Sequence, residues 1–224
     1  RAGARNGECQ KWTSVFMKLI FATHNPGKVI EMRQILKGLP IELMSMDEAG
    51  VHEDPVEDGA TFKDNALKKA RFCATKTGEW CFADDSGLCI DVLGGRPGIH
   101  TKRWAGSERA EDIMAFTLKQ LEGVSFKKRT AQFVSVVALV APDGREWIFE
   151  GITPGFVSEA VRGKNILPQL PYDPIFIPEE GNRTFAEMTD VEKNDISHRG
   201  RAFAQLEQFL ATISVSPETE NGYV

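Results

Sequence analysis

The sequence predicts an α/β fold: a mixed, elongated and twisted sheet flanked by helices, with two lobes around a central cleft. Helix-like and strand-like segments alternate through the first half of the chain, as they do where crossover helices join neighbouring strands. Two long strand-like segments, 130–140 and 146–153, follow around Pro142-Asp143-Gly144, which favours an antiparallel hairpin. No repeat or linker interrupts the pattern, so we expect a single α/β domain over residues 17–212.

A strand and two helices open the predicted domain. Residues 18–23 form an apolar run with strand character, and apolar residues at helical spacing predict a helix over 27–37. Residues 41–60 are acidic, and we expect them to be irregular. A second helix is expected over 62–76, because Thr61 suits its N-cap and a glycine follows its end.

The later elements are shorter. A strand over 80–83 is expected to run into the polar turn Asp84-Asp85-Ser86-Gly87, and strand character resumes over 88–92. The remaining expectations are a glycine-rich loop over 93–98, a helix over 108–121 capped by Ser107, a strand over 175–177 and a last helix capped by Ser197.

Composition limits the classes of function. The chain has 224 residues, of which 42% are hydrophobic, and a formal net charge of −5. An acidic chain is a poor candidate for the basic face that binds nucleic acid polymers, so we expect no such partner. No apolar run approaches the roughly 20 residues of a membrane span, so we expect no membrane partner either.

The cysteines and the chain ends complete this outline. The four cysteines, at 9, 73, 81 and 89, form no CxxC pair, which argues against a zinc site and fits a reducing, cytoplasmic location. Met17 stands directly before the first strand-like run, so we expect residues 1–16 to be a disordered leader or appended segment. Residues 213–224 are expected to form a polar tail.

Positive side chains stand where helices should repel them. Lys28 follows the helix-start signal Asn25-Pro26-Gly27, and His198 and Arg199 begin another expected helix. A cation at a helix N-terminus costs about 0.3–1 kcal/mol. One charge pair roughly 4 Å apart contributes about 4 kcal/mol at an effective dielectric of about 20, so a bound anion would outweigh that cost. With Lys69 in a third helix, the pattern predicts a polyphosphate ligand.

The neighbouring carboxylates of Asp84 and Asp85 predict a cation site. At a strand end they repel each other unless a cation lies there, and magnesium suits a few carboxylates completed by phosphates or water. One of the two could instead orient a water as general base, and a plain surface turn is the remaining alternative. Glu57 is a further candidate ligand, or part of a solvated acidic loop.

The cation clusters also have plainer interpretations. The stretch from Thr23 to Lys28 matches neither standard phosphate-loop motif, and an ordinary strand–helix turn with an exposed lysine would fit it. Residues 192–199 would fit a capped helix with exposed charges. In the functional interpretation, Lys193 and Arg199 donate to ligand oxygens, and His198 hydrogen-bonds to a base or stacks on it.

Five segments carry a family resemblance: FATHNPGK from residue 21, EDGATFKDNALKKAR from 57, FADDSGL from 82, YDPIFIPEEGNRTFAEM from 172 and EKNDISHRGRA from 192. Over roughly residues 17–212 the chain resembles the inosine triphosphate pyrophosphatases, also described as non-canonical purine nucleoside triphosphate pyrophosphatases. The resemblance implies hydrolysis of ITP, dITP and XTP to the monophosphate and pyrophosphate with Mg²⁺, which cleanses the nucleotide pool. It also implies an elongated α/β fold with a central cleft, and a homodimer.

The resemblance further assigns roles to residues. Asp85 matches the catalytic aspartate, and the metal site is matched by Glu57, Asp84 and Asp85. The substrate-binding residues that it implies are Lys28 and Lys69 at the phosphates, Asp173, Lys193, His198 and Arg199 at the base, and Thr23, Asn25, Ser86 and Tyr172 elsewhere along the substrate.

The stretch before Tyr172 departs from the family pattern. The family has a glycine-aromatic-glycine stretch there, whereas this chain has the longer Ile166-Leu167-Pro168-Gln169-Leu170-Pro171. No aromatic side chain remains to stack on the base, a contact that can contribute about 1–3 kcal/mol. We expect weaker nucleotide binding and altered base selectivity, with the phosphate chemistry intact.

Two other functions fit the same residues. The chain could be an NTPase that releases orthophosphate from the γ position, and product analysis separates the two reactions. It could also be a nucleotide-binding protein whose turnover is impaired by the altered 166–171 segment. Such a protein would show nucleotide-dependent thermal stabilisation without hydrolysis.

Overall fold

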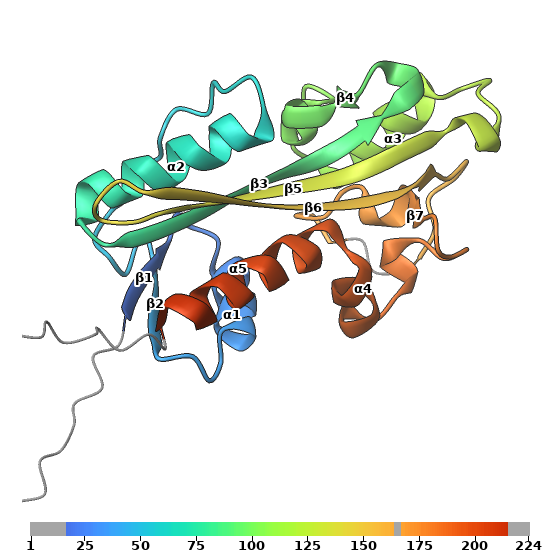
Figure 1. Cartoon of the computed structure of the whole chain (residues 1–224). Helices are drawn as coiled ribbons and strands as arrows, with labels where there is room; N and C mark the ends of the chain where they lie inside the picture. The colour runs from blue at the N-terminus through green and yellow to red at the C-terminus, as the bar shows by residue number, and fades with distance from the viewer. Residues whose placement is uncertain (1–16, 164–166, 215–224) are drawn as a thin grey trace, which may run out of the picture.

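The computed structural model describes residues 17–163 and 167–214, and its frame is a mixed sheet of seven strands formed by these residues (Figure 1). The strand order is β2-β1-β3-β5-β6-β7, with β4 paired to β3 outside this path. The strands are β1 (Met17–Phe21), β2 (Ile41–Ser45), β3 (Trp80–Ile90), β4 (Arg96–Pro97), β5 (Thr130–Val140), β6 (Glu146–Val157) and β7 (Phe176–Pro178).

The sheet is parallel at one end and antiparallel at the other. β1 pairs in parallel with both β2 and β3, because helices connect these strands. β3, β5, β6 and β7 pair in antiparallel order, and β5 and β6 form the hairpin that the sequence predicts. The fold class is therefore confirmed, while the division into two lobes stays a prediction.

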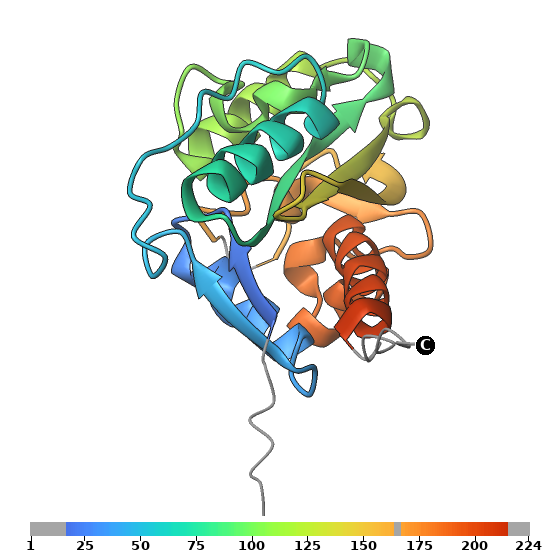
Figure 2. The same cartoon turned by 60° about the vertical axis from the view of Figure 1, so that its left-hand side comes forward.

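Helices cover both faces of the sheet (Figures 1 and 2). On one face, α2 (Phe62–Thr77) packs against β3 and β5 around Ala66, Ala70 and Cys73. On the other face, α1 (Pro26–Ile35) and α5 (His198–Ser214) bury an apolar cluster that contains Met32 and Phe203. The phosphate-binding candidate Lys28 of α1 and the base-binding candidates His198 and Arg199 of α5 therefore share one face of the sheet, opposite α2 and its Lys69.

A third apolar cluster lies at the far end of the sheet. It joins α3 (Ala110–Gln120) to β3, β5 and the segment that contains Tyr172 and Phe185. Ser107 does not cap α3, because that helix begins two residues later than its expected start and has Arg109 at its N-cap. The Ser107 hydroxyl instead accepts a hydrogen bond from the Arg109 amide and donates one to Asp112.

Two strand predictions were wrong. Residues 41–45, expected to be irregular, form β2, whose partner is the distant strand β1. The expected break at Asp84-Asp85-Ser86-Gly87 does not exist, since β3 runs without interruption from Trp80 to Ile90 beside β5. The surface-turn alternative for these residues is therefore excluded. Pairing with a neighbouring strand overrides the local turn preference of Asp, Ser and Gly.

A short helix that the sequence did not indicate directly precedes the C-terminal helix. α4 (Asp190–Ile196) ends at Ser197, and α5 begins immediately after it. The Ser197 hydroxyl accepts from the Gly200 amide at 3.0 Å, so the predicted cap is confirmed. A Cβ on Gly151 of β6 would lie 1.9 Å from the His198 carbonyl oxygen, which shows how closely the start of α5 rests on the sheet.

The chain ends are only partly described. The predicted leader, residues 1–16, lies outside the described residues, as does the tail from residue 215. α5 extends to Ser214, so the first two residues of the predicted 213–224 tail are helical. Within residues 17–163 and 167–214, no helix is long and apolar enough to cross a membrane.

Candidate active site

The site lies where β1 leaves the sheet. β1 is flanked by two parallel partners and ends at Phe21, after which the chain turns into α1. The Asn25 side chain caps this helix by accepting from the amides of Gly27 and Lys28 at 2.9 and 3.3 Å. β3 continues beyond the end of β1 and exposes its free edge there. Ligands of open α/β sheets bind in such crevices at the carboxyl ends of strands.

The two neighbouring aspartates point to opposite faces of β3. Asp84 lies opposite Val137 of β5 and Asp85 opposite Val136, and successive strand residues alternate between faces. Val137 belongs to the α1/α5 core and Val136 to the α2 core. The carboxylates are therefore separated by the sheet, and each has its own set of cations.

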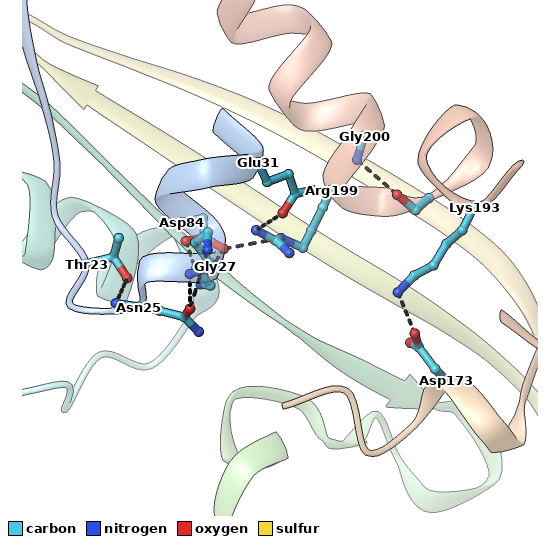
Figure 3. A network of polar contacts seen from close by, with 11 residues as sticks. Thr23, Asn25, Gly27, Glu31, Asp84, Asp173, Lys193, Arg199 and Gly200 are labelled. Atoms are coloured by element: carbon cyan, nitrogen blue, oxygen red, sulfur yellow. Dashed lines mark hydrogen bonds and ion pairs between the residues drawn. The ribbon is translucent and has the colours of Figure 1, made fainter. Parts of the chain in front are cut away.

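Asp84 lies under the cations of α1 and α5 (Figure 3). Lys28 Nζ donates to both Asp84 oxygens at 2.7 and 2.8 Å, and Arg199 Nε lies 3.6 Å from Oδ2. The Asp84 side chain is only 2% exposed. Burial is the largest single effect and opposes its ionisation, but the combined attraction of Lys28, Arg199 and Lys69 outweighs it, so the net effect lowers the pKa of Asp84. Glu31 shares Arg199, with its Oε2 3.3 Å from Nη2.

Asp85 faces the polar side of α2. Asn65 Nδ2 donates to its Oδ2 at 3.1 Å, and Lys69 Nζ lies 3.8 Å from its Oδ1. Asn65 and Lys69 are four residues apart and so share one helix face. Lys69 Nζ also lies 3.5 Å from Oε1 of Glu57, which brings a second carboxylate to the same place. Burial, reinforced by repulsion from Glu57 and Asp84, raises the pKa of Asp85.

Another part of the site holds the residues expected to bind the nucleobase. Lys193 of α4 is ion-paired with Asp173, and burial raises the pKa of that carboxyl despite the lysine. The His198 ring stacks on Phe133 of β5, with centroids 4.5 Å apart and planes 7° apart. Burial, together with the charges of Arg199 and Lys193, lowers the pKa of His198 well below its usual value, so the ring is neutral at neutral pH.

A cavity of about 410 Å³ lies between Lys28 of α1, Arg199 of α5 and the Asp173–Lys193 pair, all of which line it. The predicted residues that line it are Lys28, Ser86, Tyr172, Asp173, Lys193, His198 and Arg199. Glu57, Lys69 and Asp85 do not line this cavity, and they lie together on the α2 side of β3, where Asp85 directly precedes the lining residue Ser86. Thr23 and Asn25 form the turn that leads into Lys28. The structure therefore gathers the predicted residues into two groups, one around the cavity and one on the α2 side of the strand.

The 166–171 segment, which differs from the family pattern, forms part of the cavity wall through the residues just before Tyr172. Gln169, Leu170 and Pro171 line the cavity, whereas Ile166 lies outside the described residues. The Tyr172 hydroxyl donates to the carbonyl oxygen of Thr101 at 2.9 Å, which ties this wall to the opposite rim. The wall is thus aliphatic and amide in character where the family pattern has an aromatic ring.

Some residues of the site were not among the predicted ones. Glu31 lies one helical turn after Lys28, a spacing that would have indicated a shared face. Phe133 carries no local signal, because its position under His198 depends on how β5 and α5 pack. Asn65 lies one turn before Lys69, and its own amide oxygen accepts from the Gly59 amide at 2.8 Å.

The carboxylates on the α2 side suit magnesium. Asp85 and Glu57 face the same lysine, and their mutual repulsion contributes to the raised pKa of Asp85. Magnesium uses one or two protein carboxylates and completes its shell with water and substrate phosphates. Among the described residues, no three acidic, histidine or cysteine side chains form a ready-made metal group.

Fold and site together define an α/β protein with a cavity near the carboxyl end of a parallel strand, lined by cations that include Lys28, Lys193 and Arg199. The Ham1 family model matches residues 19–209, and the chain belongs to this family.

Individual relatives agree with this assignment. The dITP/XTP pyrophosphatase of Caldanaerobacter subterraneus is 40% identical over 196 residues, which cover 87% of this chain and 96% of the relative. A solved HAM1 protein from Coxiella burnetii has a TM-score of 0.81 at 37% identity, covering 88% of this chain and 99% of its own. The nucleoside-triphosphatase/dITP/XTP pyrophosphatase of Mycobacterium abscessus has a TM-score of 0.73 at 42% identity, covering 85% and 98%.

Proposed function

We propose that this protein hydrolyses non-canonical purine nucleoside triphosphates, namely ITP, dITP and XTP, to the monophosphate and pyrophosphate. The observation that carries the proposal is a cavity of about 410 Å³ lined by Lys28, Lys193 and Arg199 and by Ser86 of β3. The next residue of that strand, Asp85, is 16% exposed and lies 3.8 Å from Lys69. Relatives named as dITP/XTP pyrophosphatases match nearly the whole domain and support the same reaction.

The lysines would bind the phosphate chain from two sides of β3. Lys28 reaches the crevice from the start of α1, and Lys69 reaches it from α2. Bound magnesium, held by Glu57 and Asp85, would add positive charge at the phosphates. Because phosphoryl transfer depends mostly on positioning and electrostatic stabilisation, these groups are sufficient for the reaction.

Asp85 would act on the attacking water. Asn65 holds Oδ2, and Asp85 accepts the proton of the water as its oxygen bonds to the α-phosphorus. The bond from that phosphorus to the α–β bridging oxygen breaks, and pyrophosphate leaves. Asp84 was predicted as a metal ligand too, and that role stays untested. We propose that it mainly holds Lys28 and Arg199, to which its oxygens are directed.

The base end would favour 6-oxo purines. Lys193 and Arg199 only donate hydrogen bonds, so they suit the 6-oxo oxygen of hypoxanthine or xanthine and not the 6-amino group of adenine. The neutral ring of His198, stacked on Phe133, is held in one orientation at this end. The aliphatic wall at Leu170 and Pro171 supports the expectation of weaker base binding.

A substrate panel tests the proposal. ITP, XTP, dITP, GTP and ATP are incubated with Mg²⁺, and pyrophosphate and orthophosphate are measured separately. Pyrophosphate formed in preference from ITP, dITP or XTP supports the proposal, while direct release of orthophosphate identifies a γ-phosphatase. Thermal stabilisation by ITP with neither product identifies a nucleotide-binding protein.

Two further parts of the proposal concern the protein's setting. We propose a homodimer, for which sedimentation of the purified protein is the test. A cytoplasmic location fits the free thiols of Cys73, Cys81 and Cys89, which the structure leaves unpaired by disulfides.

A further inference from the structure

A histidine outside the cavity links two parts of the site. His24 Nδ1 lies 2.9 Å from Oδ1 of Asp47, and its Nε2 lies 3.5 Å from Oδ1 of Asp54. His52 approaches the same Asp47 oxygen at 3.4 Å. The His24 side chain is 28% exposed, whereas that of His52 is 72% exposed. His24 is thus the more enclosed histidine and lies between two carboxylates.

His24 and the two aspartates that it contacts belong to different segments of the site. His24 lies between Thr23 and Asn25, in the turn that leads into Lys28. Both carboxylates belong to the acidic segment, residues 46–60, which contains no helix or strand and carries Glu57. The imidazole therefore joins the phosphate-binding turn to the segment that carries a candidate metal ligand.

The acidic segment is also tied to both α1 and α2. Near its start, Glu48 accepts from Arg33 of α1 at 2.7 Å. Its later part is held by α2. Glu53 pairs with Lys76 at 2.6 Å, Asp58 pairs with Lys68, and Glu57 pairs with Lys69 at 3.5 Å. Arg33 thus fixes the start of the segment to α1, and the three lysines fix its later part to α2. The contacts of His24 add a direct link from the phosphate-binding turn to Asp47 and to Asp54, which lies three residues before Glu57.

We propose that His24 is a positioning residue that ties the acidic segment to the phosphate-binding turn and thereby sets the place of Glu57 relative to Lys28. An imidazole suits this role because its two nitrogens project in different directions, here Nδ1 toward Asp47 and Nε2 toward Asp54. The effect on catalysis rests on the proposed function. The effect on the free protein does not, because it concerns the packing of the acidic segment alone.

Hydrogen exchange of the free protein tests the link directly. The amides of Val51 and Gly59 donate to Met46 O at 2.9 Å and to Asn65 Oδ1 at 2.8 Å. In His24→Leu these two amides should exchange at least five times faster, while the amides of β5 and β6 keep their rates. His52→Leu is the matched control, because it removes the other histidine from Asp47, and it should leave the exchange of both amides unchanged.

Kinetics and two gentler variants complete the test. His24→Leu should lower kcat/KM about tenfold for ITP and XTP alike, so that base selectivity stays constant. His24→Asn, which keeps one donor toward Asp47, should recover part of both effects. Asp54→Ala should reproduce faster exchange at Val51 and Gly59 without altering the turn itself, and it decides the matter if His24→Leu fails to fold. Unchanged exchange in His24→Leu or Asp54→Ala, or equal effects of His52→Leu, would overturn the proposal even if the protein hydrolyses ITP as expected.

Discussion

Replacing Asp84 by asparagine should mainly lower stability, whereas replacing Asp85 by asparagine should mainly lower turnover. Asp84→Asn removes the negative charge that balances Lys28 and Arg199, from a side chain that is only 2% exposed. Breaking a buried ion pair from one side costs about 3–5 kcal/mol, because the remaining charge stays buried without its partner. For a chain of this size about 1 kcal/mol changes Tm by roughly 2–4 °C, so Tm should fall by roughly 6–20 °C.

Asp85→Asn should behave differently because burial already disfavours the charge at that position. The pKa of Asp85 is raised, and its nearest cation, Lys69, lies 3.8 Å away and is shared with Glu57. Neutralising Asp85 should therefore leave Tm unchanged or slightly higher. Turnover should fall about 10²- to 10⁴-fold, as expected for the loss of a general base.

Differential scanning calorimetry and a pyrophosphate assay on the two variants provide the comparison. Nucleotide binding by Asp85→Asn, measured by calorimetric titration with ITP, controls for loss of the site. Equal decreases in Tm for both variants would refute the argument that the two carboxylates occupy different electrostatic environments. Near-normal turnover of Asp85→Asn would remove this residue from the mechanism.

Three further predictions follow from the site. Burial lowers the pKa of His198 below its ordinary value of 6.5, so near that pH only the unfolded chain takes up this proton, and the free energy of unfolding should decrease as the pH falls below about 6.5. Urea midpoints between pH 7.5 and 5.5 measure this pH dependence. His198→Gln should reduce it. Lys69→Ala should lower kcat/KM roughly 10- to 100-fold through loss of a charge-assisted phosphate contact, and the same loss with ITP and XTP would separate it from base recognition. Leu170→Phe should restore stacking and lower KM for ITP about fivefold or more, and an unchanged KM would contradict the role assigned to this wall.

Local chemistry made several elements predictable from the sequence. Thr61 caps α2 in a complete capping box with Asp64, and Gly78 ends that helix in the left-handed conformation. Asn25 caps α1 with proline in its first turn. These features depend on hydrogen bonds between residues at most four positions apart, so the local sequence contains all the information they require.

Strand pairing was less accessible because its partners are distant. β2 forms only because residues 41–45 meet β1, and β3 continues through Asp84 and Asp85 only because β5 pairs with it there. Nothing within a few residues of these segments indicates such a partner. The same limit applies to Phe133, whose stacking on His198 joins β5 to α5.

The sequence by itself determined the fold class, the caps of α1, α2 and α5, the family motifs and the identity of most of the charged residues that form the site. Only the tertiary structure decided which carboxylate each cation approaches. Successive residues of a strand face opposite sides, so the uninterrupted β3 places Asp84 with Lys28 and Arg199 and places Asp85 with Asn65 and Lys69. This separation gives each of two acidic neighbours in the chain its own polar partners, on opposite faces of the sheet.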